Sequence, residues 1–381
     1  MRFLRKTAGN LTLLYERCCP VVAAAYFLWT ALSLMQWNDP AYAGTAALIM
    51  KALRVIYAVP MAGVIACGWV LKPKRALYQV PILIILLWSH TFFRVSWLLD
   101  VFLFAFASRY VNGGRMLKAA CLSWFAILLM TAVLLLTGLT KNRVIDFRYA
   151  VGQSFGLLHP NTAGIALLST ALAVWCAFLQ KKPVATAILF WAAAAAAWFL
   201  CASRTSALLL AVFPVLYGAV LLLRKNGRDR VLKLSVFLPA ALMLLSLALT
   251  LCALSGSVPM PGNFLMRFRK AAAAIRQYGI RPLGSPVELG GKMILDNQYM
   301  YWLICQGILP TLLILGLDTC MMHRFASEKA YGPLLVCVIC LGLGFMENLS
   351  VWPIVNAMPL ILLCGEGKIP DRENTAEEKI A

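Results

Sequence analysis

Long stretches without a charged residue recur along this chain, and they restrict its fold more than any other feature. The clearest are 184–203 (VATAILFWAAAAAAWFLCAS), 205–223 (TSALLLAVFPVLYGAVLLL) and 234–255 (LSVFLPAALMLLSLALTLCALS). About 20 apolar residues in a helix cross the roughly 30 Å hydrocarbon core of a bilayer, where backbone polar groups must bond within the segment. The composition agrees, since 62% of the residues are hydrophobic and 13% are charged. The sequence therefore predicts an all-α polytopic membrane protein.

The apolar pattern accommodates about twelve transmembrane helices (roughly 10–12). Two of them, 76–90 and 92–108, are short, and the alternative is one broken pair. The predicted helices cover 18–37, 46–71, 76–90, 92–108, 119–139, 161–180, 184–203, 205–223, 234–255, 297–317, 332–346 and 350–364. The chain then consists of helices one to nine (1–255), a large loop (256–296), helices ten to twelve (297–364) and a tail (365–381).

The short basic connections predict which ends of the helices face the cytoplasm. With the basic N-terminus inside, the connections KPKR (72–75), SRYVNGGRMLK (108–118), QKK (180–182) and RKNGRDRVLK (224–233) are inside as well, and both termini are cytoplasmic. These connections account for most of the formal net charge of +20, so the charge does not indicate nucleic-acid binding. The cations assigned to the outer side are Lys141, Arg143, Arg148, Arg204, Arg267, Arg269, Lys270, Arg276, Arg281 and Lys292.

The large outer loop contains a helical pattern of its own. Leu265, Phe268, Ala272 and Ile275 share one face, and arginines flank it. We expect this amphipathic helix to lie on the membrane surface with its apolar face down. The guanidinium fork matches phosphate oxygens, so the interpretation favoured here is specific binding of a lipid-linked pyrophosphate. The alternative is general attraction to anionic headgroups. The loop arginines are Arg267, Arg269, Arg276 and Arg281.

Two shorter segments place polar residues at the same outer side. In FGLLHPNTAG, Pro160 suits a first helical turn and biases His159 towards an extended backbone, while Asn161 follows it. A helix start alone explains the proline but not the histidine before it. Arg204, in CASRTSALLL, lies at a tight helix connection, where it serves either as a surface anchor or as a group facing the bundle interior.

A further polar segment opens the predicted helix 297–317. Asp296 and Asn297 in LDNQYMYWLICQGILP are either ordinary helix caps or members of a site. Tyr299 is one of several aromatic residues there that either stack on a sugar or belong to an interfacial belt.

Taken together, FGLLHPNTAG, ASRTSALL, an arginine-bearing outer loop and LDNQYMYWLICQGILPTLL resemble the O-antigen polymerase and ligase superfamily. The similarity is greatest to the Wzy-type polymerases of exopolysaccharide and capsule pathways, and it covers about residues 140–320. The large loop contains no histidine, whereas the ligase branch is thought to use one there, so ligase activity is the less favoured reading.

This resemblance implies a polymerase of undecaprenyl-pyrophosphate-linked repeat units on the outer face of a bacterial plasma membrane. A sugar hydroxyl attacks the anomeric carbon of the growing chain, undecaprenyl pyrophosphate leaves, and no cofactor or metal is expected. Membrane lipids and other assembly proteins, such as a flippase or a chain-length regulator, are the expected partners. The alternatives are a ligase that moves glycan to another acceptor, a transporter of lipid-linked sugars, and a non-catalytic scaffold.

Such a transfer needs cations at the leaving group and a base or orienting acceptor at the attacking hydroxyl. His159 is the first candidate for the base, with Asp146, Glu288 and Asp296 behind it. The predicted catalytic residues are His159, Arg204, Arg267 and Asp296. The predicted substrate-binding residues are Arg148, Asn161, Arg269, Arg276, Arg281, Asn297 and Tyr299.

Overall fold

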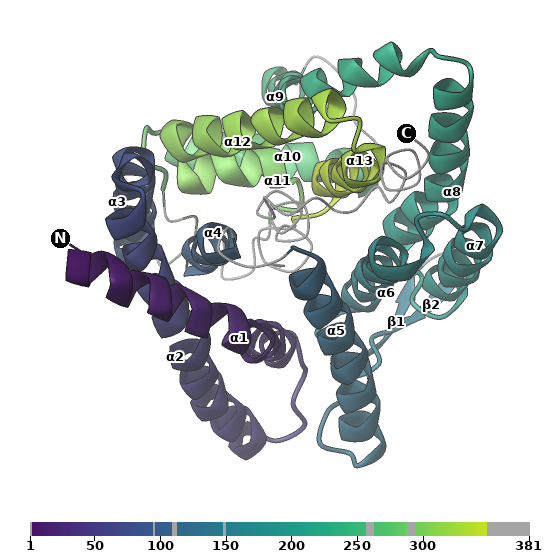
Figure 1. Cartoon of the computed structure of the whole chain (residues 1–381). Coiled ribbons are helices and arrows are strands. Elements are labelled where there is room, and N and C mark those ends of the chain that lie inside the picture. The colour runs from purple at the N-terminus through teal and green to yellow at the C-terminus, as the bar shows by residue number, and fades with distance from the viewer. Residues whose placement is uncertain are drawn as a thin grey trace.

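The computed structural model describes residues 2–93, 96–108, 113–147, 150–256, 263–285, 287 and 295–348 (Figure 1). In these ranges most residues are helical. The α-helices are α1 (Arg2–Ser33), α2 (Pro40–Leu71), α3 (Ala76–Phe93), α4 (Ser96–Ser108), α5 (Gly113–Leu136), α6 (Pro160–Val174), α7 (Pro183–Phe199), α8 (Arg204–Lys225), α9 (Leu238–Ser255), α10 (Asn263–Tyr278), α11 (Gln298–Tyr301), α12 (Ile308–Ser327) and α13 (Tyr331–Met346). Short 3-10 segments η1 (Pro73–Arg75) and η3 (Asp229–Phe237) and π-helical segments η2 (Trp175–Leu179) and η4 (Trp302–Gln306) extend or join them.

Within the described ranges, six helical segments are long and apolar enough to cross a membrane: Lys6–Ser33, Pro40–Leu71, Pro160–Leu179, Arg204–Lys225, Arg230–Ser255 and Ile308–Ser327. The prediction of a helical membrane protein is confirmed at this level. The larger number of about twelve spans stays a prediction, and the helix expected at 350–364 and the tail 365–381 lie outside the described residues.

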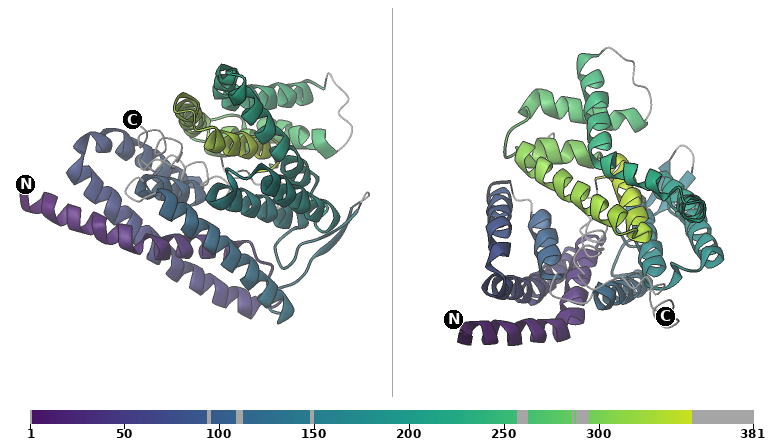
Figure 2. Two further views of the ribbon diagram at one scale, coloured as in Figure 1. Left: turned by 45° about the vertical axis from the view of Figure 1, so that its right-hand side comes forward. Right: turned by 45° about the horizontal axis from the view of Figure 1, so that its top comes forward.

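A β-hairpin departs from the all-α expectation. Strands β1 (Val144–Phe147) and β2 (Ala150–Gln153) pair antiparallel, with Val144 opposite Gln153. The backbone N–H of Gln153 also donates to the carbonyl of Leu200 at 2.9 Å, which ties the hairpin to the end of α7. Figure 2 shows the hairpin projecting past the ends of the neighbouring helices.

The helix predicted at 297–317 is broken, so this expectation is wrong. Gly307 has a φ of 96°, and α12 starts anew at Ile308. The carbonyls of Arg281 and Pro282 accept the N–H groups of Ile308 and Leu309, both at 3.0 Å. The preceding loop therefore crosses the break and satisfies the new helix start. A Cβ on Gly284 would lie 2.1 Å from the carbonyl oxygen of Cys305, so only glycine permits this approach.

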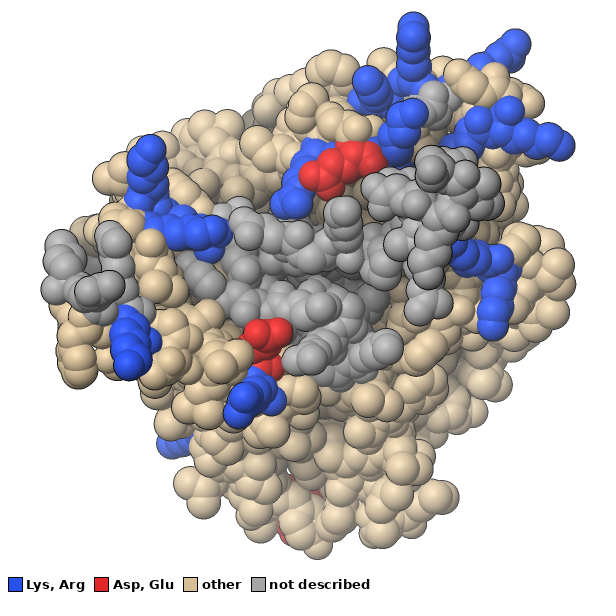
Figure 3. Space-filling view, viewed as in Figure 1, with Lys and Arg blue, Asp and Glu red and all other residues tan. Residues whose placement is uncertain are grey.

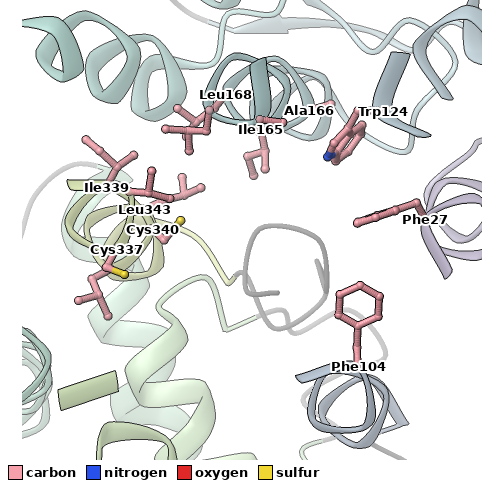
Figure 4. Packing of buried hydrophobic residues seen from close by; sticks show 14 of the residues in the cluster. Phe27, Phe104, Trp124, Ile165, Ala166, Leu168, Cys337, Ile339, Cys340 and Leu343 are labelled. Atoms are coloured by element: carbon pink, nitrogen blue, oxygen red, sulfur yellow. The ribbon is translucent and has the colours of Figure 1, made fainter. Parts of the chain in front are cut away.

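Helix α6 is an inner helix of the bundle. In its most apolar stretch 67% of the residues are buried, compared with 28% for α8. Figure 4 shows Ile165 and Leu168 of α6 on the side of Ile339 and Leu343 of α13, with Trp124 of α5 nearby. The long apolar side chains of the outer helices remain exposed, as a surface facing lipid requires.

Helices α6, α8 and α13 connect the same two ends of the bundle. Thr205 near the start of α8 lies 3.5 Å from Glu347 at the end of α13, measured between Oγ1 and Oε1. Arg224 near the end of α8 lies over the ring of Tyr331 at the start of α13, 5.4 Å from its centroid. Because α8 has 22 residues, the two ends are separated by about 33 Å along its axis. We name them the Glu347 end and the Arg224 end.

Basic side chains gather near the Arg224 end. Figure 3 shows Lys and Arg residues at the upper right, over the connection between α8 and α9. Lys225, Arg228, Arg230 and Lys233 of this connection are exposed. An exposed basic connection is typical of the cytoplasmic side of a membrane protein, and the side on which it lies stays a prediction.

Candidate functional site

Charged residues from three separate parts of the chain meet at the Glu347 end. Arg267 of α10 donates from Nη2 to Oε1 of Glu347 at 3.0 Å, and their side chains are only 17% and 14% exposed. Thr205 of α8 contacts the same carboxylate oxygen. One helical turn further along α10, Lys270 Nζ lies 3.1 Å from Oδ2 of Asp296, just before α11. Two ion pairs are thus anchored on one helix; Arg267, Lys270, Asp296, Glu347, Thr205 and His159 are called the polar cluster below.

The ion pair with Glu347 engages only one of the two terminal nitrogens of Arg267. Its Nη2 holds Glu347, but its Nη1 is buried and has no hydrogen-bond partner among the described residues. A buried guanidinium N–H without a partner costs free energy, so such groups are rare and require an explanation. A ligand oxygen that reached Nη1 would remove this cost. Arg267 is therefore the residue of the cluster best prepared for an anion.

His159 is held in place by its own helix. Its backbone is extended (φ −154°), and its Nδ1 accepts a hydrogen bond from the backbone N–H of Asn161 at 3.1 Å. Burial lowers the pKa of His159, Arg143 lowers it further, and Asp296 opposes both. The ring is therefore neutral near pH 7, and with Nδ1 acting as acceptor the proton is on Nε2. This tautomer presents a donor at its other nitrogen, which suits the orientation of an oxygen; the role of His159 as the first candidate base stays a prediction.

The pKa of Glu347 is shifted in the opposite direction. Burial raises the pKa of its carboxyl, the charge of Arg267 lowers it, and Asp296 raises it. The shift shows that removing the carboxylate from water outweighs the ion pair. A carboxylate with a raised pKa accepts a proton more readily than an ordinary one.

Asn297 and Tyr299 hold the fold together. The amide of Asn297 donates to Ser246 Oγ at 3.0 Å and to the carbonyl of Phe345 at 2.8 Å, while its Oδ1 accepts from the N–H of Met300 at 2.9 Å. Tyr299 is fully buried, and its hydroxyl donates to the carbonyl of Leu341 at 3.2 Å. Both side chains are buried and bonded to protein groups, and their substrate-binding roles stay a prediction.

The predicted amphipathic helix forms, but its apolar face packs against protein, and its location at the membrane surface stays a prediction. In α10 Phe268 is fully buried, with its ring 5.9 Å from that of Phe345, and the helix packs against α9. Its apolar face is thus covered by protein. Arg269 and Arg276 are exposed, and Arg276 donates to the carbonyl of Leu254 at the end of α9.

The remaining predicted residues have different positions. Arg204 is exposed at the first position of α8, directly before Thr205. Arg281 is exposed and contributes its carbonyl to the start of α12. Asn161 is half-buried in the first turn of α6. Arg148 and Glu288 lie outside the described residues.

The structure adds three residues that the sequence did not assign to the site: Thr205, Lys270 and Glu347. Glu347 had a readable signal, because it is a single carboxylate at the end of the apolar run 332–346. Lys270 had one as well, since it lies one turn after Arg267 in a helical pattern.

No protein-family model, no curated protein and no solved structure matches this chain.

Proposed function

We propose that this protein is a membrane glycosyltransferase that polymerises undecaprenyl-pyrophosphate-linked repeat units. The observation that carries the proposal is the buried Nη1 of Arg267, which no described residue bonds, next to a second cation, Lys270, and two carboxylates. Such an arrangement suits a reaction that releases a pyrophosphate and takes a proton from a hydroxyl. The resemblance of the same segments to polysaccharide polymerases supports the choice of substrate.

In the proposed reaction, a sugar hydroxyl of one repeat attacks the anomeric carbon of the growing chain. The bond from that carbon to the pyrophosphate oxygen breaks, and undecaprenyl pyrophosphate leaves with the electron pair. Arg267 and Lys270 stabilise its growing negative charge. Glu347 is the preferred acceptor of the hydroxyl proton because its pKa is raised, and His159 donates from Nε2 to orient an oxygen.

We further propose that the Glu347 end faces the outside of a bacterial plasma membrane and that both termini are cytoplasmic. The exposed basic connection at the Arg224 end supports this orientation. The substrates would then be membrane lipids carrying glycan, with a flippase or a chain-length regulator as further partners.

The test is the length of the glycan made in the native host when the chromosomal gene encodes Arg267→Ala. Loss of one well-placed cation costs about 3 kcal/mol, roughly a hundredfold in rate, so single lipid-linked repeats should accumulate on the outer leaflet without a polymer ladder. Arg228→Ala, at the exposed connection of the Arg224 end, is the matched control and should give wild-type polymer. A normal ladder from Arg267→Ala at wild-type protein level would refute the proposal.

A transporter of lipid-linked sugars is the second candidate, because the break at Gly307 and the ion pair of Arg54 with Asp100 (3.2 Å) are features that transporters use. In a gene deletion, accumulation of repeats on the inner leaflet would indicate this function. Long polymer that remained on the lipid carrier would indicate a ligase.

A further inference from the structure

A cavity lies at the Arg224 end, away from the polar cluster. Its volume is about 300 Å³, the lower end of the range of small-molecule sites. The cavity is lined by the connection between α6 and α7, the last turns of α8 and the connection between α12 and α13. Trp175, Gln180, Tyr217 and Gly332 contribute to its wall.

Three cations surround this cavity: Lys181, Arg224 and Lys329. All three are exposed, and they come from the connection between α6 and α7, the last turn of α8 and the connection between α12 and α13. The described residues that line the cavity include no Asp or Glu, and the neighbouring Glu328 is held by Arg324 at 2.8 Å. The electrostatic potential in the cavity is therefore positive, as a site for an anion requires.

The wall also contains the starts of two helices. Helices α7 and α13 both begin at the cavity, with Pro183 and Tyr331, and neither has a side-chain cap. The positive ends of two helix dipoles therefore add to the charge of the three cations.

Lys329 occupies a position where glycine would be expected. It follows the end of α12 with a φ of 55°, in the left-handed region that L-residues with a side chain disfavour. A lysine there gives the turn no conformational advantage, but it brings an ammonium group to the cavity. The substitution Lys329→Gly would therefore remove the charge and relieve the disfavoured backbone conformation at the same time.

We propose that this cavity binds a phosphate group, carried either by the headgroup of an anionic membrane lipid or by a soluble phosphate compound. The three cations and the two helix starts provide the recognition. The cavity lies at the far end of α8 from the polar cluster, about 33 Å along the helix, so it is a separate site. The proposal does not depend on the enzymatic function.

The test uses the purified full-length protein in nanodiscs, with sodium pyrophosphate as the soluble probe in phosphatidylcholine discs. Calorimetric titration should detect binding that Lys329→Gly and Arg224→Gln each weaken at least tenfold. Lys225→Gln is the matched control, because Lys225 is an exposed cation beside Arg224 that does not line the cavity. Lys329→Gly should unfold at the same temperature as the wild type or higher, so weaker binding would not reflect misfolding.

The lipid source is tested by the melting temperature in phosphatidylglycerol discs relative to phosphatidylcholine discs. A rise of several degrees that Lys329→Gly removes identifies a lipid headgroup as the ligand. Pyrophosphate binding without such a rise identifies a soluble phosphate compound. If neither is seen, or if both survive Lys329→Gly and Arg224→Gln, the proposal is wrong. Because the polar cluster is itself proposed to bind pyrophosphate, the titrations are repeated in an Arg267→Gln background. The losses caused by Lys329→Gly and Arg224→Gln should be the same there, which separates this site from the polar cluster.

Discussion

Gly164 and Ser203 lie in such close contact that a Cβ built on the glycine would come within 2.3 Å of the serine Cβ. Gly164 belongs to the first turns of α6, and Ser203 immediately precedes α8. The contact thus joins the segments FGLLHPNTAG and ASRTSALL and brings the starts of both helices together. Because His159 and Thr205 are at these starts, the glycine determines how close two members of the polar cluster can be.

Gly164→Ala should destabilise the protein by about 1–3 kcal/mol, because the added methyl group has to displace Ser203 or α6. The measurement is thermal unfolding in detergent micelles. Gly218→Ala in α8 is the control, since its added Cβ would meet nothing within 4 Å, and it should be neutral or stabilising by up to about 1 kcal/mol. Equal melting temperatures for the two variants would show that α6 and α8 do not pack as described.

The sequence predicts local features of this site well and long-range features poorly. Pro160 after an extended His159 predicts the start of α6, because both signals lie within a few residues. The spacing of Phe268 and Ala272 predicts α10 as a helix, but not that Phe345 covers it, since that partner lies far away in the chain. The hairpin at Val144–Gln153 is missed because two four-residue strands give little alternation to read.

The contribution of the Arg267–Glu347 ion pair to folding stability should depend on pH. In Arg267→Gln, the buried Glu347 loses the cation that lowers its pKa, so the pKa rises further. A carboxyl whose pKa is raised in the folded state stabilises the fold at pH values below its ordinary pKa. This stabilisation is lost as pH rises through the folded-state pKa, so the variant should be least stable at alkaline pH. We expect a loss of about 3 kcal/mol at pH 8 and less at pH 5.

The double variant Arg267→Gln/Glu347→Gln is the control for this ion pair. It removes both charges, so most of the lost stability should return and the extra pH dependence should disappear. Chemical unfolding in micelles at pH 5 and pH 8 measures both effects. A double variant as unstable as the sum of the single variants would mean that the two side chains do not interact.

Two substitutions of His159 should distinguish a structural role of this side chain from a functional one. Asparagine is a good helix N-cap, so His159→Asn should keep the stability of α6 within a few tenths of a kcal/mol, whereas His159→Ala should lose about 1 kcal/mol. If Nε2 orients substrate as proposed, both variants lose polymer. Wild-type polymer from His159→Asn, with loss only from His159→Ala, would reduce the role of this histidine to its cap.

The lowered pKa of His159 also predicts how the stability of the protein changes at acidic pH. Because burial and Arg143 lower the pKa of His159, its contribution is fully present above about pH 6.5 and is lost as pH falls through the depressed folded-state pKa. Protonation also places a hydrogen on Nδ1, which then no longer accepts the Asn161 N–H. In melting curves between pH 7 and pH 5, the wild type should therefore lose more stability than His159→Asn.

Asn297 is expected to matter for folding more than for chemistry. Its side chain caps α11 through Oδ1 and bonds Ser246 of α9 and the carbonyl of Phe345 in α13 through its amide, so one group joins three helices. Asn297→Ala leaves these partners without hydrogen bonds in a buried site and should cost about 2–4 kcal/mol. Asn297→Asp keeps the acceptor for Met300 but turns the donor into an oxygen facing the Phe345 carbonyl, so it should be at least as destabilising at pH 8. Thermal unfolding of both variants in micelles measures this. If Asn297→Asp is as stable as the wild type while polymer is lost, Asn297 belongs to the substrate site after all.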